Sequence, residues 1–214
     1  MARNLLETLG LDEDLAFLGF GTRTIAGVEC TAFRLSFTGE LSYELHHARG
    51  DSVRLWTALL DAGQPHGILP HGLEALMRLR LEKGHIVVGQ DTDYDSTPRR
   101  LDHGWAVNLD SGEFVGRQAT LRTDRLALDK RLVGLTAPQV PHEGASLWDG
   151  DRFAGHVTSA AWSPVTESAV MLAWLRLDQG ADPDHIEVET FEGRIPARLA
   201  TLPFYDPKGE APRG

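Results

Sequence analysis

The stretch His71–Gly89, HGLEALMRLRLEKGHIVVG, is the part of the sequence around which we expect the rest of the chain to be organised. Its apolar residues recur at spacings of three and four, as on one face of a helix: Leu73, Leu76, Met77 and Leu81. Pro70 suits the start of this helix, and Gly84 suits the left-handed residue after its end. The run Ile86–Val88 then predicts a short buried strand.

Glu82 is the residue of this helix that a structural role explains least well. It falls in the last turn, where the helix dipole disfavours an anion by about 0.3–1 kcal/mol, and rules of this kind tend to fail where function overrides them. One interpretation is a solvated glutamate that pairs with Arg78 or Lys83. The other is a carboxylate that accepts two hydrogen bonds from a ligand with paired N–H donors.

Length and composition limit the class of protein. The chain has 214 residues, which allows one large domain or two small ones. The formal net charge of −10 argues against nucleic acid or an anionic membrane as a partner. The only cysteine, Cys30, rules out an intrachain disulfide and is expected to be a buried small hydrophobe. Because there is no long apolar run and no signal-peptide core, we expect no membrane span and a cytoplasmic location.

Helix and strand signals are mixed in residues 1–125. Extended segments are predicted at Leu15–Phe20, Thr22–Ala26, Val28–Ser36, Leu41–His46 and Trp105–Val107. Besides the central helix, helical segments are predicted at Asn4–Leu9, Ser52–Ala62 and Gln118–Leu121. The helix at Ser52–Ala62 is expected to bury Val53, Trp56, Leu59 and Leu60. This order predicts an α+β layer with helices on one face of a sheet.

The pattern changes in residues 126–214, where short apolar runs recur regularly. They are Leu132–Leu135, Ser146–Trp148, Gly155–Thr158, Ala169–Leu175, Ile186–Val188 and Ile195–Leu199. Turn signals separate them, including Asp149-Gly150, Glu192-Gly193 and Pro183. Such spacing is typical of a small β-barrel or sandwich, so we divide the chain into domains 1–125 and 126–214.

Few chemical motifs stand out. Asp91, Asp93 and Asp95 resemble the start of a calcium loop, but the glycine and glutamate that complete such a loop are missing. They are equally consistent with a turn in which aspartates bond nearby backbone amides. No metal site, nucleotide loop or nucleophile motif is predicted. Trp162 follows a turn of small residues, where it would either cover a neighbouring pocket or fill the barrel core.

Several segments, in order along nearly the whole chain, carry a family resemblance. They are Arg34–Leu45 (RLSFTGELSYEL), Gly63–Pro70 (GQPHGILP), Leu79–Pro98 (LRLEKGHIVVGQDTDYDSTP), Gly104–Val107 (GWAV), Phe114–Arg117 (FVGR), Arg131–Leu135 (RLVGL), Gly155–Pro164 (GHVTSAAWSP) and Phe204–Gly209 (FYDPKG). Together they resemble the glycine-cleavage T-protein (aminomethyltransferase) family. Within this family, one branch is the folate-binding C-terminal region of heterotetrameric sarcosine oxidase alpha subunits. The segments that favour this branch are GQDTD, GHVTS and FYDPKG.

The resemblance implies a fold and a ligand. The fold is T-protein-like, with an α/β layer followed by a small C-terminal β-barrel, and the ligand is tetrahydrofolate. The glutamate of the family's RLE-G motif grips the pterin, and Glu82 matches it. Tyr43 matches an aromatic residue near the pterin, and we add Trp162 as a further cofactor contact. In the oxidase branch, an N-methylamine is oxidised on a flavin elsewhere, and tetrahydrofolate captures the one-carbon unit as 5,10-methylenetetrahydrofolate.

Two departures from the family pattern matter. Family members carry a further portion before the part matched here, with the aspartate credited with catalysis, so the fold is expected to be N-terminally truncated and the catalytic residue is unknown. T-proteins also have a basic run where this chain has Asn108–Asp110. Arg117, Arg131 and Lys130 are the residues that would compensate in holding the folate tail.

Three hypotheses follow. The first is a folate-binding subunit of a sarcosine-oxidase-like demethylase, with flavin, and any NAD, on partner chains. The second is a non-catalytic subunit that stabilises a flavoprotein. The third is a stand-alone transferase or cyclase that does not use folate. A truncated fold exposes apolar surface and strand edges, so we expect a flavoprotein or T-protein-like partner chain, or a second copy of this one.

Overall fold

The computed structural model describes residues 1–12, 15–178, 180, 182 and 185–214, which form two compact units. Unit 1 comprises Met1–Leu79 and Lys208–Gly214, and unit 2 comprises Arg80–Pro207. The boundary falls inside helix α3 (Leu73–Glu82), whose extent matches the predicted central helix. The division of the sequence at residue 126 stays a prediction.

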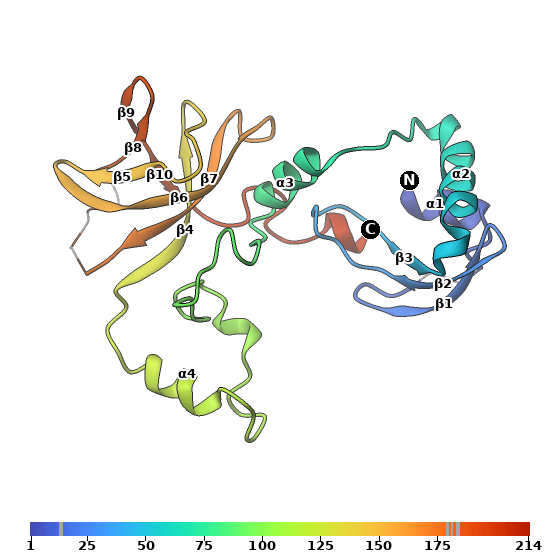
Figure 1. Ribbon diagram of the computed structural model, residues 1–214, viewed down its shortest axis with the longest axis horizontal. Coiled ribbons are helices and arrows are strands. Elements are labelled where there is room, and N and C mark those ends of the chain that lie inside the picture. The colour runs from blue at the N-terminus through green and yellow to red at the C-terminus, as the bar shows by residue number, and fades with distance from the viewer. Residues whose placement is uncertain (13–14, 179, 181, 183–184) are drawn as a thin grey trace. The chain divides into compact units, whose positions relative to one another are not determined.

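Unit 1 is a small sheet with helices on one face (Figure 1). Its antiparallel strands lie in the order β1 (Phe20–Ile25), β2 (Val28–Phe33) and β3 (Glu44–His47). The α-helices are α1 (Ala2–Thr8) and α2 (Ser52–Gly63), and short 3₁₀ turns occur at Arg49–Asp51, Gln64–His66 and Ala211–Arg213. This arrangement confirms the predicted α+β layer. The extended segment predicted at residues 15–20 is wrong except at Phe20, which is the first residue of β1.

The core of unit 1 lies between this sheet and the helices. Its buried residues are Leu6, Leu11, Ile25, Val28, Cys30 and Leu55. Cys30 is 1% exposed, which confirms its predicted burial. The apolar face predicted for α2 is partly wrong, because the helix turns Leu55 toward this core and leaves Val53 78% and Trp56 55% exposed.

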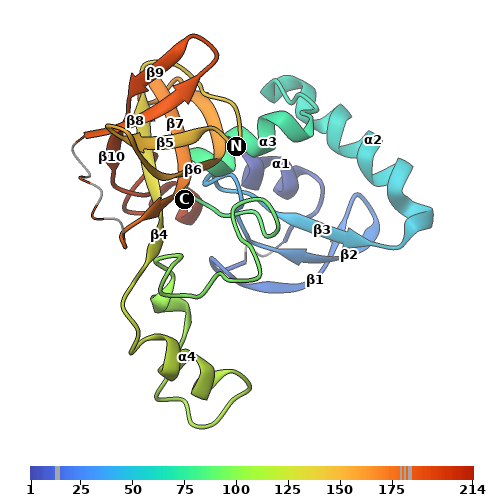
Figure 2. The same cartoon turned by 60° about the vertical axis from the view of Figure 1, so that its left-hand side comes forward.

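Unit 2 contains a seven-stranded antiparallel sheet in the order β10-β4-β7-β6-β5-β8-β9. The strands are β4 (Lys130–Ala137), β5 (Ser146–Asp149), β6 (Arg152–Ser163), β7 (Ser168–Arg176), β8 (Ile186–Thr190), β9 (Gly193–Pro196) and β10 (Arg198–Ala200). Only Ala197 separates β9 from β10, which lie at opposite ends of this order, so the sheet must curl (Figure 2). The predicted small barrel is therefore confirmed, and the run predicted at Ile195–Leu199 is two strands.

The barrel interior is filled by residues of alternate strand positions. They include Leu135, Leu147, Val157, Met171, Ala173, Leu175, Ile186 and Val188. A second cluster packs against the sheet from outside, with Leu81, Leu132, Ala161, Val170, Leu172 and Trp174. This outer cluster attaches the end of α3 to the barrel.

The segment between α3 and the barrel differs from two predictions. Ile86–Val88 is not a strand: the chain turns there, Val88 is 84% exposed, and the Val87 N–H donates to the side chain of Asp91 instead of to a neighbouring strand. Trp105–Val107 is not a strand either, since Gly104–Ala106 form a 3₁₀ turn. The predicted helix near Gln118 is confirmed as α4 (Arg117–Thr123). The turn expected at Pro183 lies outside the described residues.

Helix lengths bear on the membrane prediction. Within the described residues, none of the helices is both long and apolar enough to cross a bilayer.

Gly155 gives a test of the barrel. Its φ is +146°, and a Cβ there would lie 1.8 Å from the carbonyl oxygen of Trp174 on the neighbouring strand. Because the Cβ position is set by the backbone and the oxygen is itself a backbone atom, neither can move aside, and Gly155→Ala is expected to destabilise the chain by about 3 kcal/mol or more. Gly150→Ala, in an open turn with φ +59°, should cost only about 1–2 kcal/mol. Urea unfolding measures both, and equal losses would contradict this packing.

Candidate functional site

The last turn of α3 lies along one face of strand β6. The consecutive residues Arg80–Glu82 are all buried. Side chains at alternate positions of a strand share a face, and three such residues meet this turn: Ser159, Ala161 and Ser163. Arg80 bonds the first, Leu81 shares an apolar cluster with the second, and Glu82 bonds the third. The position of Glu82 is therefore fixed from both sides.

Arg80 is the anchor of this arrangement. Its Nη1 lies 2.7 Å from Asp91 Oδ2, and the two side chains are 1% and 0% exposed. The same nitrogen donates to the His85 carbonyl at 3.0 Å, and Nη2 donates to Ser159 Oγ at 2.6 Å. One guanidinium thus ties the helix to the following loop and to β6.

Asp91 completes the anchor. Its Oδ2 also accepts the Val87 N–H at 2.8 Å, and its Oδ1 accepts the hydroxyls of Thr158 and Ser159, each at 2.6 Å. These contacts support the interpretation of the loop as a turn in which aspartates bond backbone amides, and Asp93 likewise accepts the Asp95 N–H. In the part of the chain that the structure describes, no group of His, Cys, Asp or Glu residues is arranged to hold a metal ion.

Glu82 is 7% exposed. Its Oε1 accepts the hydroxyl of Ser163 at 2.5 Å, and its backbone carbonyl accepts the Tyr205 N–H at 2.9 Å. The interpretation of Glu82 as a solvated member of an ion pair is wrong. Lys83 donates to Asp206 at 2.8 Å instead, and Arg78 bonds Glu74 at 2.6 Å. The end of β6 therefore contacts the Glu82 carboxylate, and Tyr205 of the FYDPKG segment contacts the Glu82 backbone.

Charged residues cover the loop that follows. Lys130 lies 3.1 Å from Asp93 and 3.3 Å from Asp95, and Arg100 lies 2.6 Å from Asp95. The hydrogen bond from Arg100 lowers the pKa of Asp95. Burial opposes ionisation of Asp93, but bonds from Ser96 and Lys130 outweigh it and lower the pKa of that carboxyl as well. Both aspartates stay ionised at neutral pH and hold the loop to β4.

The other candidate cofactor-binding residues of unit 2 are Trp162, Arg117 and Arg131. Their contacts are with groups other than Glu82. Trp162 is 46% exposed, so its alternative placement in the barrel core is wrong, and strand alternation directs it to the opposite face of β6 from Ser163. Arg117 donates to the Leu109 carbonyl, and Arg131 donates to Asp102 at 2.5 Å. Their roles as ligand contacts stay predictions.

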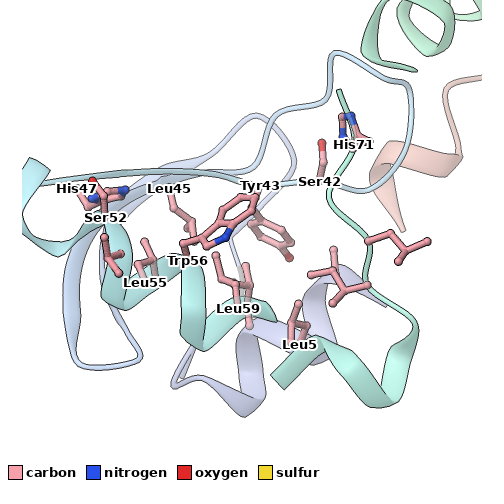
Figure 3. A pocket seen from close by; sticks show the side chains of 15 residues that line it. Leu5, Ser42, Tyr43, Leu45, His47, Ser52, Leu55, Trp56, Leu59 and His71 are labelled. Atoms are coloured by element: carbon pink, nitrogen blue, oxygen red, sulfur yellow. The ribbon is translucent and has the colours of Figure 1, made fainter. Parts of the chain in front are cut away.

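Tyr43 belongs to unit 1, where it lines an apolar groove of about 830 Å³ between β3 and α2 (Figure 3). The walls carry mainly aliphatic and aromatic side chains, including Leu5, Leu45, Leu55, Trp56, Leu59 and Ile68. Polar atoms come from a few residues at the margins: Ser42, His47, Ser52 and His71. Tyr43 is thus a wall residue of an apolar groove within unit 1, and its role as a ligand contact stays a prediction.

Sequence reasoning missed Ser163 and the Arg80–Asp91 pair. Arg80 carries a signal, since it continues the three-and-four spacing of the apolar residues on α3 and so falls on the buried face. Ser159 and Ser163 also carry one, because small polar residues at alternate positions of a predicted strand face the same neighbour. The partners of these residues are 79 and 81 positions away along the chain, and no local pattern identifies them.

These features define an α+β protein in which a helix end holds a buried carboxylate against a β-barrel. The family model for the GCVT N-terminal domain matches residues 1–111, and that for the glycine cleavage T-protein C-terminal barrel domain matches residues 130–206. The chain belongs to the glycine cleavage T-protein family, which confirms the resemblance inferred from its motifs.

Individual relatives support the same family assignment. The aminomethyltransferase of Halothermothrix orenii is 34% identical over 194 residues, which cover 90% of this chain and 54% of that protein. The mitochondrial dimethylglycine dehydrogenase of Homo sapiens is 33% identical over 212 residues, covering 95% of this chain and 24% of that one. The structure of glycine cleavage system aminomethyltransferase T from Bartonella henselae matches with a TM-score of 0.84 at 25% identity, over 95% of this chain and 57% of that one. The chain thus spans about half the length of the aminomethyltransferases it matches.

The Arg80–Asp91 pair gives a second test. Asp91→Asn leaves the buried guanidinium without its counter-charge, which is expected to cost about 3–5 kcal/mol of unfolding free energy. Glu74→Gln is the matched control, because the Glu74–Arg78 pair on the same helix is exposed, and it should cost about 0.5 kcal/mol or less. Urea unfolding followed by tryptophan fluorescence measures both. A similar small effect of the two substitutions would show that Asp91 does not anchor the turn.

Proposed function

We propose that this chain binds tetrahydrofolate and that Glu82 accepts hydrogen bonds from the pterin ring. The observation that carries the proposal is the burial of this carboxylate at the end of a helix. A buried carboxylate costs several kcal/mol unless its oxygens are bonded, and a helix C-terminus adds to that cost. Ser163 supplies one neutral donor. The 2-amino group and N3–H of a pterin form a donor pair that matches the remaining acceptor capacity.

The residues of this chain fit the rest of such a ligand by their chemistry. Tyr43, which is half-buried in unit 1, and Trp162, which is exposed on the face of β6 opposite Ser163, are proposed as ring contacts by their residue type alone. Arg131 is 43% exposed and Arg117 24% exposed, each beside a more exposed acidic partner. Such surface pairs are worth about 0–1 kcal/mol, so a carboxylate of the folate tail can replace the acidic partner. When bound, tetrahydrofolate supplies the nitrogens N5 and N10 that accept a one-carbon unit.

The chain's own contribution is to bind and orient. Holding the acceptor nitrogens at the site where the one-carbon unit arrives converts an encounter between two molecules into a reaction within one complex. Excluding water there protects a reactive imine or formaldehyde equivalent from loss. No catalytic acid or base is assigned.

We further propose that the one-carbon unit comes from N-methylamine oxidation, within a sarcosine-oxidase-like assembly that produces 5,10-methylenetetrahydrofolate. The similarity to dimethylglycine dehydrogenase supports this, because it extends over 95% of this chain and only 24% of that larger protein. The oxidising flavin, and any NAD, would then be carried by a partner chain. The exposed side chains of α2 and the groove beside it are consistent with such a partner.

Calorimetric titration with tetrahydrofolate tests the proposal. Glu82→Gln should weaken binding about 100-fold, because the neutral amide has lost one acceptor and the charge that strengthens the bonds. Glu74→Gln, the same substitution on the exposed side of the same helix, should leave the affinity unchanged. A well-folded wild-type chain that binds no tetrahydrofolate would contradict the proposal and favour a structural subunit or a folate-independent transferase.

A further inference from the structure

The hydroxyl group of Ser163, the serine that bonds Glu82, takes part in two hydrogen bonds. The backbone N–H of Thr166 donates to Ser163 Oγ at 3.3 Å, and the Ser163 hydroxyl donates to Glu82 Oε1. Ser163 is 0% exposed. Its hydroxyl proton is therefore directed at the carboxylate and not shared with solvent.

This bond restricts the one torsion of Glu82 that matters for a planar donor pair. The last torsion of a glutamate side chain has a broad, roughly two-fold profile, so the plane of a free carboxylate turns easily. A hydrogen bond to one oxygen fixes that plane. A fixed plane favours a ligand with two coplanar N–H donors over a ligand with one, because the geometry is set before binding.

We propose that Ser163 is a positioning residue that orients the Glu82 carboxylate and so sets selectivity for the paired donors of a pterin. The inference rests on the proposed function, since it concerns the same carboxylate. Ser163 itself touches no ligand in this proposal. It acts through the bond to Glu82, and the backbone N–H of Thr166 orients its hydroxyl.

The experiment must distinguish an effect of Ser163 on the orientation of Glu82 from an effect on the stability of the chain. Ser159 provides the matched control. It lies four residues earlier on the same face of β6 and is also buried, at 1% exposure. Its hydroxyl bonds Asp91 and Arg80 but not Glu82. Ser159→Ala and Ser163→Ala therefore remove the same group from the same strand, and both should lower the melting temperature.

The experiment measures affinity for tetrahydrofolate and for its analogue with hydrogen in place of the 2-amino group. The wild-type chain should prefer tetrahydrofolate about 100-fold, as a site built to bond an N–H rejects ligands that lack it. Ser163→Ala should reduce this preference to about 10-fold. Ser163→Cys, which keeps a weaker donor of similar size, should be intermediate. Ser159→Ala should keep the wild-type preference within about 2-fold, because Arg80 keeps its bonds to Asp91 and His85 and Glu82 keeps its bond to Ser163.

Two results would overturn the inference: an unchanged preference in Ser163→Ala, or an equal loss in Ser159→Ala, which would show a general effect of destabilisation. Failure of the proposed function looks different. In that case the wild-type chain binds no tetrahydrofolate, or Glu82→Gln binds it as well as the wild-type chain does.

Discussion

The buried ion pair between Arg80 and Asp91 is the interaction on which the arrangement of unit 2 depends. A guanidinium and a carboxylate with 1% and 0% exposure are stabilised when most of their remaining donors and acceptors are also bonded, although the Arg80 Nε–H has no partner among the described residues. Here the partners come from the His85 carbonyl, the Val87 N–H and the hydroxyls of β6. Satisfying one charged pair therefore forces the end of α3, the loop after it and the middle of β6 into a single geometry.

Glu82 follows from that geometry. It lies two residues beyond Arg80 on the helix, and its partner Ser163 lies four residues beyond Ser159 on the strand. Two helix residues rise only about 3 Å, whereas four strand residues rise about 13 Å. The side chains of Arg80 and Glu82 therefore diverge to reach the two serines, and Leu81 lies in the apolar cluster with Ala161. A buried carboxylate that accepts one neutral donor among the described residues is then placed at the end of β6, a central strand of the barrel. Rigid elements of this kind are where a binding group can be held in one orientation.

Periodicity predicted most barrel strands, because they bury residues against a core. It also predicted the extents of α3 and α4, although α4 has no buried residue and α3 buries only Arg80–Glu82. It failed where side chains replace ladder hydrogen bonds: Ile86–Val88 has the composition of a strand, but Asp91 accepts the Val87 N–H. It also could not show that β9 and β10 are two strands, since only closure of the sheet distinguishes them. For the site, the odd position of Glu82 was visible in the sequence. The bond from Ser163 to Glu82 and the bonds from Thr158 and Ser159 to Asp91 were not, because they join segments 67 to 81 positions apart in the chain.

We propose that the turn Arg80–Glu82 is fixed on β6 so that Glu82 meets a pterin, and a crystal structure of the chain with bound tetrahydrofolate would test this. We expect a Glu82 carboxylate oxygen at about 2.7–2.9 Å from the pterin 2-amino nitrogen, with the bonds from Ser163 to Glu82 and from Arg80 to Asp91 retained. A pterin bound elsewhere on the chain, or a Glu82 side chain that leaves Ser163 when the ligand binds, would contradict it.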